Sequence, residues 1–359
     1  MQNNQAIPFN KENFKLIFSK EFALVVIVSI PSAFVAEFLN IPLAWFLGPM
    51  IATSIASLFG LNIKMPKLIL STTLILLGLY IGNYIDKNLF SQIHQWAWTS
   101  LIMLIYIIIS VLIVSKYLQI FSKYERKTSI FSAAPGALGP LMILAEDEKK
   151  TDLSQVATSH LIRLIIIITI FPFIVDNFYD VESTKFTEEI VDNQNIIHLI
   201  LLIVCSIILI TIFDRLKIPA ALLSGTLFAS GILQISEIAT YKLSPNIIDY
   251  CLLILGASVG CRFANKTFSE IARNAWHSFI ATFLLVVLGL IAAFAASLII
   301  DKNFFTLILS YCPGGIYEVA VIAVFFNLDP EFVSFHHIIR LLMILFIVPS
   351  ILKFIEKKT

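Results

Sequence analysis

Two stretches of this sequence carry helix-breaking residues inside apolar surroundings. One contains Pro135-Gly136, and the other, about 175 residues later, contains Pro313-Gly314-Gly315. Non-helical backbone inside a bilayer leaves N–H and C=O groups unpaired, which costs several kcal/mol each unless protein, water or a ligand satisfies them. We therefore expect the breaks to open half-helices whose exposed amides and dipole ends face a common polar cavity. The alternative, which the sequence leaves open, is that these residues only kink two membrane helices.

A histidine and an arginine follow each break at the same spacing. In each case the arginine comes three positions after the histidine, which places both on one face of a helix. The pairs are His160 with Arg163 and His337 with Arg340. A charged side chain near the centre of a membrane helix costs on the order of 2.5–3.5 kcal/mol, so such residues usually face the bundle interior or water. The arginines could hold an anionic solute, or Arg340 could pair with Glu318 and stabilise the fold. The sequence does not decide between these two roles.

The composition identifies the chain as an integral membrane protein. Of its 359 residues, 58% are apolar and 14% are charged, whereas soluble proteins have about 45–50% and 25%. Runs such as "LIIIITIFPFIV" have the length and near absence of charge of bilayer-spanning helices rather than the alternation of a β-barrel. The net charge of +1 and the lack of an arginine-rich face or DNA-binding motif give no reason to expect a nucleic-acid partner.

Twelve apolar segments divide evenly between the two halves of the chain. We predict helices over residues 22–39, 41–60, 68–85, 93–115, 129–145, 156–177, 195–213, 218–236, 247–262, 275–300, 304–326 and 332–352. The fold class expected is therefore an all-α polytopic membrane protein.

The halves are related by duplication, because landmarks recur in the same order at an offset of 177 or 178 residues. The arginine pair and the two Pro-Gly breaks match in this way, and Pro140 falls on Glu318, which therefore has no acidic twin. The glycines also match, as Gly48 with Gly225, Gly78 with Gly256 and Gly82 with Gly260. We expect the last two pairs, spaced four residues apart, to let helices pack closely.

The distribution of lysine and arginine predicts the topology. If both Pro-Gly segments dip into the membrane and return, ten crossings remain, with 19 Lys/Arg inside and 4 outside. If all twelve segments cross, the counts are 15 and 8, a weaker bias. Five crossings per half make the second repeat inverted, a hallmark of secondary transporters with broken helices near mid-membrane. The predicted parts are a cytoplasmic tail 1–21, a first repeat 22–177, an acidic external linker 178–194, a second repeat 195–352 and a cytoplasmic tail 353–359.

The stretches "APGALGPLMILAEDEKKTDLSQVATSHLIRL" and "CPGGIYEVAVIAVFFNLDPEFVSFHHIIRLLMILFIVP" resemble the AbrB-type integral membrane family. The resemblance covers about residues 22–352 and rests on the Pro-Gly-Gly motif, the glutamate-containing helix after it and the histidine-to-arginine spacing. The first copy departs from the pattern at Ala137 and at Ser159-His160. The resemblance implies a duplicated membrane domain, in a family labelled ammonia monooxygenase, regulator of gene expression or transporter.

We expect a secondary transporter of a small anionic or zwitterionic solute in a bacterial cytoplasmic membrane, with both termini cytoplasmic. The alternative is a membrane-embedded sensor or regulator of gene expression that acts through a partner. No enzymatic activity, metal or cofactor is expected, because the histidines are scattered and no nucleotide-binding loop occurs. The expected partners are the lipid bilayer and the solute, and the long apolar faces are compatible with a homodimer.

Overall fold

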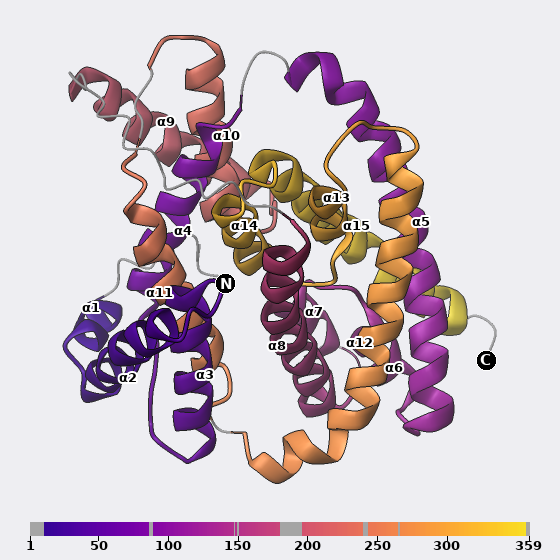
Figure 1. The fold of residues 1–359 in the computed structure, drawn as a ribbon. Coiled ribbons are helices and arrows are strands. Elements are labelled where there is room, and N and C mark those ends of the chain that lie inside the picture. The colour runs from indigo at the N-terminus through magenta and orange to yellow at the C-terminus, as the bar shows by residue number, and fades with distance from the viewer. Residues whose placement is uncertain are drawn as a thin grey trace. The chain divides into compact units, whose positions relative to one another are not determined.

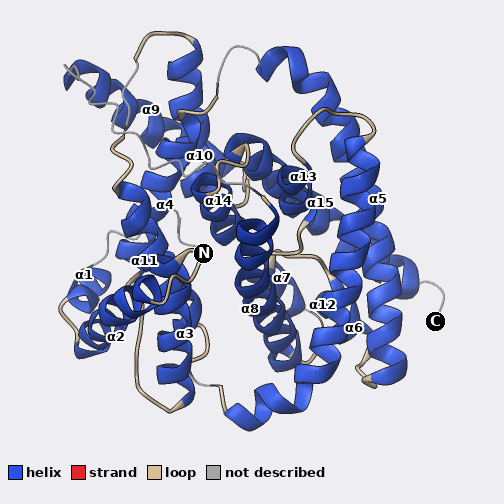
Figure 2. Ribbon diagram, in the orientation of Figure 1, coloured by secondary structure: helices blue, strands red, loops and turns tan. Residues whose placement is uncertain are grey.

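The computed structural model is helical throughout the part of the chain that it describes, with no strand among those residues (Figure 2). It describes residues 11–85, 89–146, 148, 151–179, 196–239, 243–264 and 266–356. Nearly all of the predicted acidic linker and parts of both predicted tails lie outside these ranges. The prediction of an all-α polytopic membrane fold is confirmed.

The helices follow the predicted segments in order (Figure 1). Those of the first half are α1 (Lys11–Ile17), α2 (Lys20–Phe38), α3 (Ala44–Leu58), α4 (Lys67–Gly82), α5 (Leu89–Phe121), α6 (Arg126–Ala133), α7 (Leu138–Glu146) and α8 (Leu153–Phe178). Those of the second half are α9 (Ile196–Arg215), α10 (Ala221–Ile235), α11 (Ile247–Cys261), α12 (Phe268–Ser297), α13 (Phe304–Tyr311), α14 (Ile316–Phe325) and α15 (Pro330–Glu356).

The short helix α1 lies within the predicted N-terminal tail and was missed. It is separate from α2 because the Ser19 side chain caps α2, accepting a hydrogen bond from the Phe22 amide at 3.2 Å. A cap of this kind satisfies one of the amides left free at a helix start and fixes where the helix begins.

The helices differ in length, and only some are long enough to cross a membrane. Among the described residues, six helices are long and apolar enough to cross a membrane: α2, α5, α8, α9, α12 and α15. Four others, α3, α4, α10 and α11, have 15 or 16 residues, which is about 22–24 Å at about 1.5 Å per residue. They are shorter than the roughly 30 Å hydrocarbon core. The ten predicted crossings therefore stay a prediction. The Pro-Gly segments form the short helices α6, α7, α13 and α14.

Contacts divide the chain into two units, each built from both halves. The first unit comprises residues 1–91, 172–266 and 320–331, and the second comprises 92–171, 267–319 and 332–359. The first unit therefore holds α2 to α4 with α9 to α11. The second holds α5 to α7 and most of α8, with α12, α13 and most of α15, so both Pro-Gly breaks belong to it.

Packing in the first unit is reciprocal between the two halves. Helix α3 packs against α11, and its counterpart α10 packs against α4, the counterpart of α11. In the same way α2 packs on α3, and α9 packs on α10. When element i contacts j and the copy of j contacts the copy of i, the two copies are related by a two-fold operation. The duplication seen in the sequence is thus also a duplication of packing.

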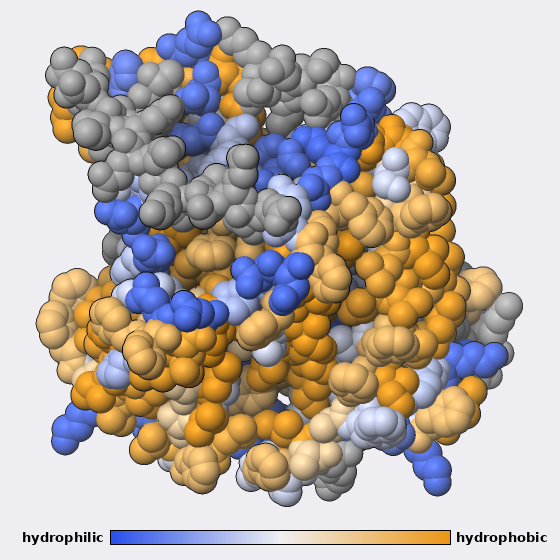
Figure 3. All heavy atoms as spheres, viewed as in Figure 1, coloured by the Kyte–Doolittle hydropathy of each residue, from blue (hydrophilic) through white to orange (hydrophobic). Residues whose placement is uncertain are grey.

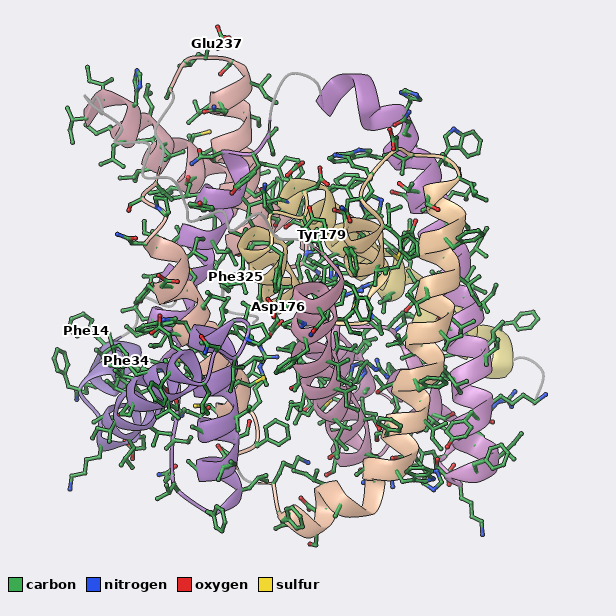
Figure 4. All side chains as sticks on the ribbon, in the orientation of Figure 1. Phe14, Phe34, Asp176, Tyr179, Glu237 and Phe325 are labelled. Carbon is green, nitrogen blue, oxygen red and sulfur yellow. The ribbon has the colours of Figure 1, made fainter. Side chains whose placement is uncertain are left out.

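Unusual backbone angles recur at matched positions of this unit. Leu43 and Ala220, which precede α3 and α10, have left-handed φ values of 54° and 57°. The second residue after α3 and the second residue after α10 behave alike, since Gly60 has φ 83° and Glu237 has φ 57°; Glu237 is labelled in Figure 4. Left-handed backbone is uncommon outside glycine, so its recurrence at an offset of 177 residues reflects a shared fold.

The glycine pairs make the crossings between α3 and α11 and between α4 and α10 close. A Cβ atom on Gly78 would lie 2.5 Å from the Leu223 carbonyl oxygen, and one on Gly256 would overlap the matched Phe46 carbonyl oxygen. The second pair is similarly close. A Cβ atom on Gly82 would lie 2.6 Å from the Leu227 carbonyl oxygen, and one on Gly260 would lie 2.8 Å from the Met50 carbonyl oxygen. Close helix packing through these glycines, as predicted, is confirmed.

The first Pro-Gly segment forms a helical hairpin in the second unit. Helix α6 packs on α7, and Lys127 near its start forms an ion pair of 2.5 Å with Glu148, just beyond the end of α7. The Asp152 amide donates to the Thr128 hydroxyl at 2.9 Å. The two ends of this hairpin therefore lie close together.

The second Pro-Gly segment also returns to its starting point. The Lys302 ammonium, just before α13, lies 5.9 Å from the centre of the Phe332 ring in the first turn of α15. Helix α13 begins with an Asn303 cap, which accepts a hydrogen bond from the Phe305 amide at 2.8 Å. In both hairpins, residues near the start of the first short helix thus lie close to residues that follow the second short helix.

Apolar side chains cover much of the surface seen in Figure 3. Along α9 the exposed residues are nearly all aliphatic, and α5 carries a similar row. Exposed apolar surface of this extent marks a membrane or protein contact. In a chain with six candidate spans, lipid accounts for it.

Adding a methyl group at the glycine crossings should destabilise the protein. We expect Gly78→Ala and Gly256→Ala each to lower the free energy of unfolding by about 1–3 kcal/mol, since the backbone must move apart. Thermal unfolding of the purified protein in detergent measures this. Gly139→Ala is the control, because a Cβ there meets nothing within 4 Å. Unchanged unfolding temperatures in both crossing variants would contradict the close packing.

The hairpins predict a definite labelling pattern. In a background lacking the four native cysteines, we expect a cysteine at Glu146 to react from the cytoplasmic side and one at Asp301 from the outside. Both positions are exposed. Twelve crossings would reverse both results, so impermeant maleimide applied to sealed vesicles of each orientation decides between the topologies.

Candidate functional site

Both Pro-Gly segments interrupt the helix, as the sequence predicts. Helix α6 ends at Ala133 and α7 begins at Leu138, while α13 ends at Tyr311 and α14 begins at Ile316. The prediction of two broken helices is therefore confirmed, and the alternative of simple kinks is wrong. Each break leaves the last carbonyls of one short helix and the first amides of the next without helical partners.

The two breaks differ in conformation. In the first, Gly136 has φ 114° and Ala137 has φ 64°, and the Gly136 amide donates to the Ala134 carbonyl at 2.9 Å. In the second, the Gly314 amide makes the matched bond to the Cys312 carbonyl at 2.8 Å, without a left-handed residue. Ala137 thus holds a conformation that usually belongs to glycine, at the position where the first copy departs from Pro-Gly-Gly.

The breaks lie against each other within the second unit. A Cβ atom on Gly136 would be 3.0 Å from Arg340 Nη2 and 3.3 Å from the Gly314 carbonyl oxygen. These are contacts between residues of the two repeats, and they place the tip of each hairpin beside the other. The candidate site residues Pro135, Gly136, Pro313, Gly314 and Arg340 are therefore brought together.

Arg163 caps the first half-helix of its own repeat. Its Nη1 and Nη2 atoms each donate a 2.5 Å hydrogen bond, to the carbonyls of Ala134 and Ser132 respectively. His160 Nε2 lies 3.0 Å from the Phe131 carbonyl. One turn of α8 thus satisfies three carbonyls at the end of α6.

Arg340 does the same for the second half-helix. Its Nη1 donates to the Cys312 carbonyl, and its Nη2 donates to the Gly314 carbonyl at 2.6 Å. His337 Nε2 lies 3.0 Å from the Leu309 carbonyl, and its Nδ1 lies 2.9 Å from Arg340 Nη2. Because a carbonyl needs a donor and the guanidinium cannot accept, His337 is the neutral Nε2–H form.

These contacts explain the spacing of histidine and arginine in both repeats. Helix C-termini carry partial negative charge, so a guanidinium beside them is stabilised without a carboxylate partner. The side chains are almost fully enclosed, with exposures of 2% for Arg163 and 0% for Arg340. The structure thus shows a role that the sequence did not suggest: each arginine donates hydrogen bonds to the carbonyl groups at the break of its own repeat.

The ion pair between Glu318 and Arg340, one of the two roles that the sequence left open, is not among the contacts of Arg340. Every hydrogen bond of the Arg340 Nη atoms goes to a carbonyl oxygen or to His337. The Glu318 carboxylate lies over Gly315, where it would overlap a Cβ atom. Gly315 is the residue from which α14 starts, so the carboxylate covers the start of its own helix.

Tyr106 is a residue of this site that sequence reasoning missed. It is 3% exposed, donates from its hydroxyl to the Leu285 carbonyl at 3.3 Å, and lies within electrostatic range of Arg163 and Arg340. Its ring meets Tyr311 edge-on, with centroids 6.2 Å apart. The feature of the sequence that could have indicated this residue is a single tyrosine within the apolar run "LIMLIYIIIS".

A second polar chain fixes α13 to α5 and α15. Tyr311 donates to the Thr99 carbonyl at 2.6 Å, and the Thr99 hydroxyl lies 2.8 Å from His336 Nε2. His336 Nδ1 lies 2.9 Å from the Phe332 carbonyl, so Nδ1 is the donor and Nε2 accepts from Thr99. His336 thus has a structural role.

The charged groups of the site do not balance. Among the described residues, the buried Asp, Glu, Lys and Arg side chains are Arg163, Arg340 and Glu318, so basic groups outnumber acidic groups by one. Within the same residues, no group of three or more His, Cys, Asp or Glu side chains is arranged to hold a metal ion.

The fold and this site define a class: a duplicated all-helical membrane protein whose two broken helices meet at their Pro-Gly tips. The chain belongs to the AbrB family, since the family model described as "Transition state regulatory protein AbrB" matches residues 2–87 and 45–356. It is similar to "Putative regulator AbrB" of Escherichia coli strain K12, with 23% identity over 88% of this chain and 91% of the relative. It is also similar to "Uncharacterized protein YhjN" of Bacillus subtilis strain 168, with 21% identity over 90% of each chain.

Removing either arginine should destabilise the protein strongly. We expect Arg163→Met and Arg340→Met each to leave two buried carbonyls unpaired, at about 1–3 kcal/mol per carbonyl. Lysine should restore only part of this, because an ammonium cannot form the planar fork. Thermal unfolding in detergent measures the loss, and Lys353→Met, an exposed cation on α15, is the control. If both methionine variants unfold like this control, the capping role is refuted.

Proposed function

We propose that the protein is a secondary carrier of a small anionic or zwitterionic solute, which binds at the two Pro-Gly breaks. The observation that carries this proposal is that two broken helices from different repeats meet beside a buried guanidinium. Broken helices in duplicated membrane proteins present amides and dipole ends to solutes near mid-membrane. The proposed binding residues are Pro135, Gly136, His160, Arg163, Pro313, Gly314, Gly315, Glu318, His337 and Arg340.

The electrostatics of the site support an anionic group on the solute. The buried side chains carry one positive charge in excess, and the starts of α7 and α14 add the positive ends of two helix dipoles. Buried charge in a membrane is costly unless it is neutralised. A solute with a negative group would neutralise it, whereas a cationic solute would be repelled.

The cellular setting is part of the same proposal. We place the protein in a bacterial cytoplasmic membrane with both termini inside, on the strength of the lysine and arginine distribution. The carrier needs no catalytic residue or cofactor, and its partners are lipid and solute, with a homodimer as the assembly to examine.

A regulatory role is the competing proposal, because the printed name of the Escherichia coli relative contains "regulator". A membrane-embedded regulator of gene expression would act through a partner protein and move no solute. Capture of a stable partner, together with absence of flux in reconstituted vesicles, would favour regulation over transport.

Flux measurements test the carrier proposal. Proteoliposomes should take up at least one of labelled acetate, lactate, glutamate or glycine when a proton or sodium gradient is imposed. We expect Arg340→Lys to reduce that uptake roughly tenfold or more, because the fork at the break is lost while the charge remains. Lys353→Met should transport like the unmodified protein. Full uptake by both Arg340→Lys and Glu318→Gln would remove these residues from the mechanism.

A further inference from the structure

Three segments at one end of the first unit are rich in basic residues. They are residues 14–22 around the start of α2, 61–67 between α3 and α4, and 261–266 at the end of α11. Their one acidic residue is Glu21, and their basic residues are Lys15, Lys20, Lys64, Lys67, Arg262 and Lys266. The segments are far apart in the sequence, so their charges form one surface only where the fold brings them together.

A small apolar cluster brings the three segments together. Its buried members are Val25, Ala56, Ile63 and Ala257, and one further residue of each segment packs against it: Phe22, Met65 and Cys261. Lys20 comes two positions before Phe22. Lys64 precedes Met65 directly, and Lys67 follows it two positions later. Helix α1, which contains Lys15, packs on both α2 and α4, so all four lysines belong to one end of the unit.

These four lysines have free ammonium groups. Lys15, Lys20, Lys64 and Lys67 are exposed, and among the described residues no hydrogen bond or ion pair engages their side chains. We call these four residues the lysine surface. A single carboxylate, that of Glu21 in the first turn of α2, cannot neutralise four ammonium groups, so the lysine surface keeps a positive charge.

The opposite ends of the same helices carry acidic residues. Helix α2 runs from Lys20 to Glu37 in its last turn, and α11 runs from Asp249 in its first turn to Arg262 just after its end. Asp249 lies within electrostatic range of Glu37, which places these two helix ends together. Positive charge is thus gathered at one end of α2 and α11, the end that the lysine and arginine distribution predicts to be cytoplasmic.

Aromatic side chains lie beside the lysine surface. Phe14 and Phe18 are 58% and 80% exposed, and their ring centroids are 6.0 Å apart. Helix α2, which starts at Lys20, is a candidate membrane span, so these rings lie where a span meets the membrane surface. Exposed aromatic rings next to lysines are typical of a segment that lies in the membrane interface.

The charge and the rings together favour one kind of partner. A soluble anion would be attracted to the ammonium groups but would gain nothing from the exposed rings. A phospholipid without net charge would contact the rings but would not be selected by the lysines. An anionic phospholipid satisfies both, because its phosphate lies at the level of the lysines and its acyl chains begin at the level of the rings.

We propose that the lysine surface, together with Phe14 and Phe18, binds the headgroups of anionic phospholipids in the leaflet at this end of α2. The inference goes beyond the proposed carrier and does not depend on it, because it uses no residue of the Pro-Gly breaks.

Acetylation of lysines in the folded protein tests this without any substitution. The unmodified full-length protein in detergent is acetylated with and without added phosphatidylglycerol, and mass spectrometry gives the rate at each lysine. We expect phosphatidylglycerol to slow acetylation of the lysine surface roughly fivefold or more. Four other exposed lysines are the internal control and should be slowed much less: Lys116, Lys123, Lys217 and Lys353. Equal slowing of both sets would overturn the inference.

Two further probes separate the alternative partners. Phosphatidylcholine has acyl chains but no net charge, and inorganic phosphate has charge but no acyl chains, so neither should protect the lysine surface. Protection by phosphatidylcholine as strong as that by phosphatidylglycerol would show that charge plays no part. Protection by inorganic phosphate would show a site for soluble anions. Either result would overturn the inference.

A matched pair of variants gives a second measurement. One carries Lys15→Gln, Lys20→Gln, Lys64→Gln and Lys67→Gln, and the other carries Lys116→Gln, Lys123→Gln, Lys217→Gln and Lys353→Gln. Both lose four positive charges on the side predicted to be cytoplasmic. We expect the first to lose its preference for phosphatidylglycerol over phosphatidylcholine by roughly tenfold or more, and the second to keep it. Native mass spectrometry of the detergent-solubilised proteins measures the bound lipid.

An equal preference in the two variants would contradict the lysine surface as the binding site. If the first variant does not fold, the acetylation rates of the unmodified protein decide the question. Phe14→Ala combined with Phe18→Ala should weaken binding of both lipids without changing the preference, because the rings contact acyl chains of either one. Unaltered binding in this variant would exclude the rings from the site and refute that part of the proposal.

Discussion

The capping of buried carbonyl groups by an arginine and a histidine is the interaction on which this structure depends. A Pro-Gly break ends a helix in surroundings where no water can satisfy its last carbonyls. A buried arginine in the same surroundings would be equally unfavourable alone. Placed together, as Arg163 with α6 and Arg340 with α13, each removes the other's penalty. This mutual dependence explains why the break and the arginine recur as one motif.

Close helix crossings at glycines in the first unit are a second constraint on the fold. Glycines bring α4 against α10 and α11 against α3 so closely that carbonyl oxygens approach the opposing helix backbone. Hydroxyl groups complete these contacts, since Ser57 donates to the Gly260 carbonyl at 3.0 Å and Thr53 lies 3.3 Å from the Ala257 carbonyl. One solution to helix packing is thus used twice, through a two-fold relation.

The two repeats differ at the starts of α7 and α14. The carbonyl caps are matched between the repeats, yet only the second helix start is covered by a carboxylate, and only the first break passes through left-handed backbone. A duplicated scaffold can therefore supply a single polar site with two unlike halves. The Glu318 carboxylate covers the start of α14, whereas the first turn of α7 contains no acidic residue.

The sequence by itself determined the helices, the duplication and the breaks, because these follow from local properties: apolar length, matched landmarks, and residues that cannot continue a helix. It also placed histidine and arginine on one helical face. Only the tertiary structure decided what that face contacts. Carbonyl groups leave no mark in a sequence, so the partners considered for Arg340 were a solute or Glu318 and not the carbonyls of its own repeat. The role of Tyr106 was hidden for the same reason, since a lone phenol in an apolar run gives no sign of its partners. Contacts between residues about 180 apart, such as Gly136 with Gly314, exist only once both repeats have folded together.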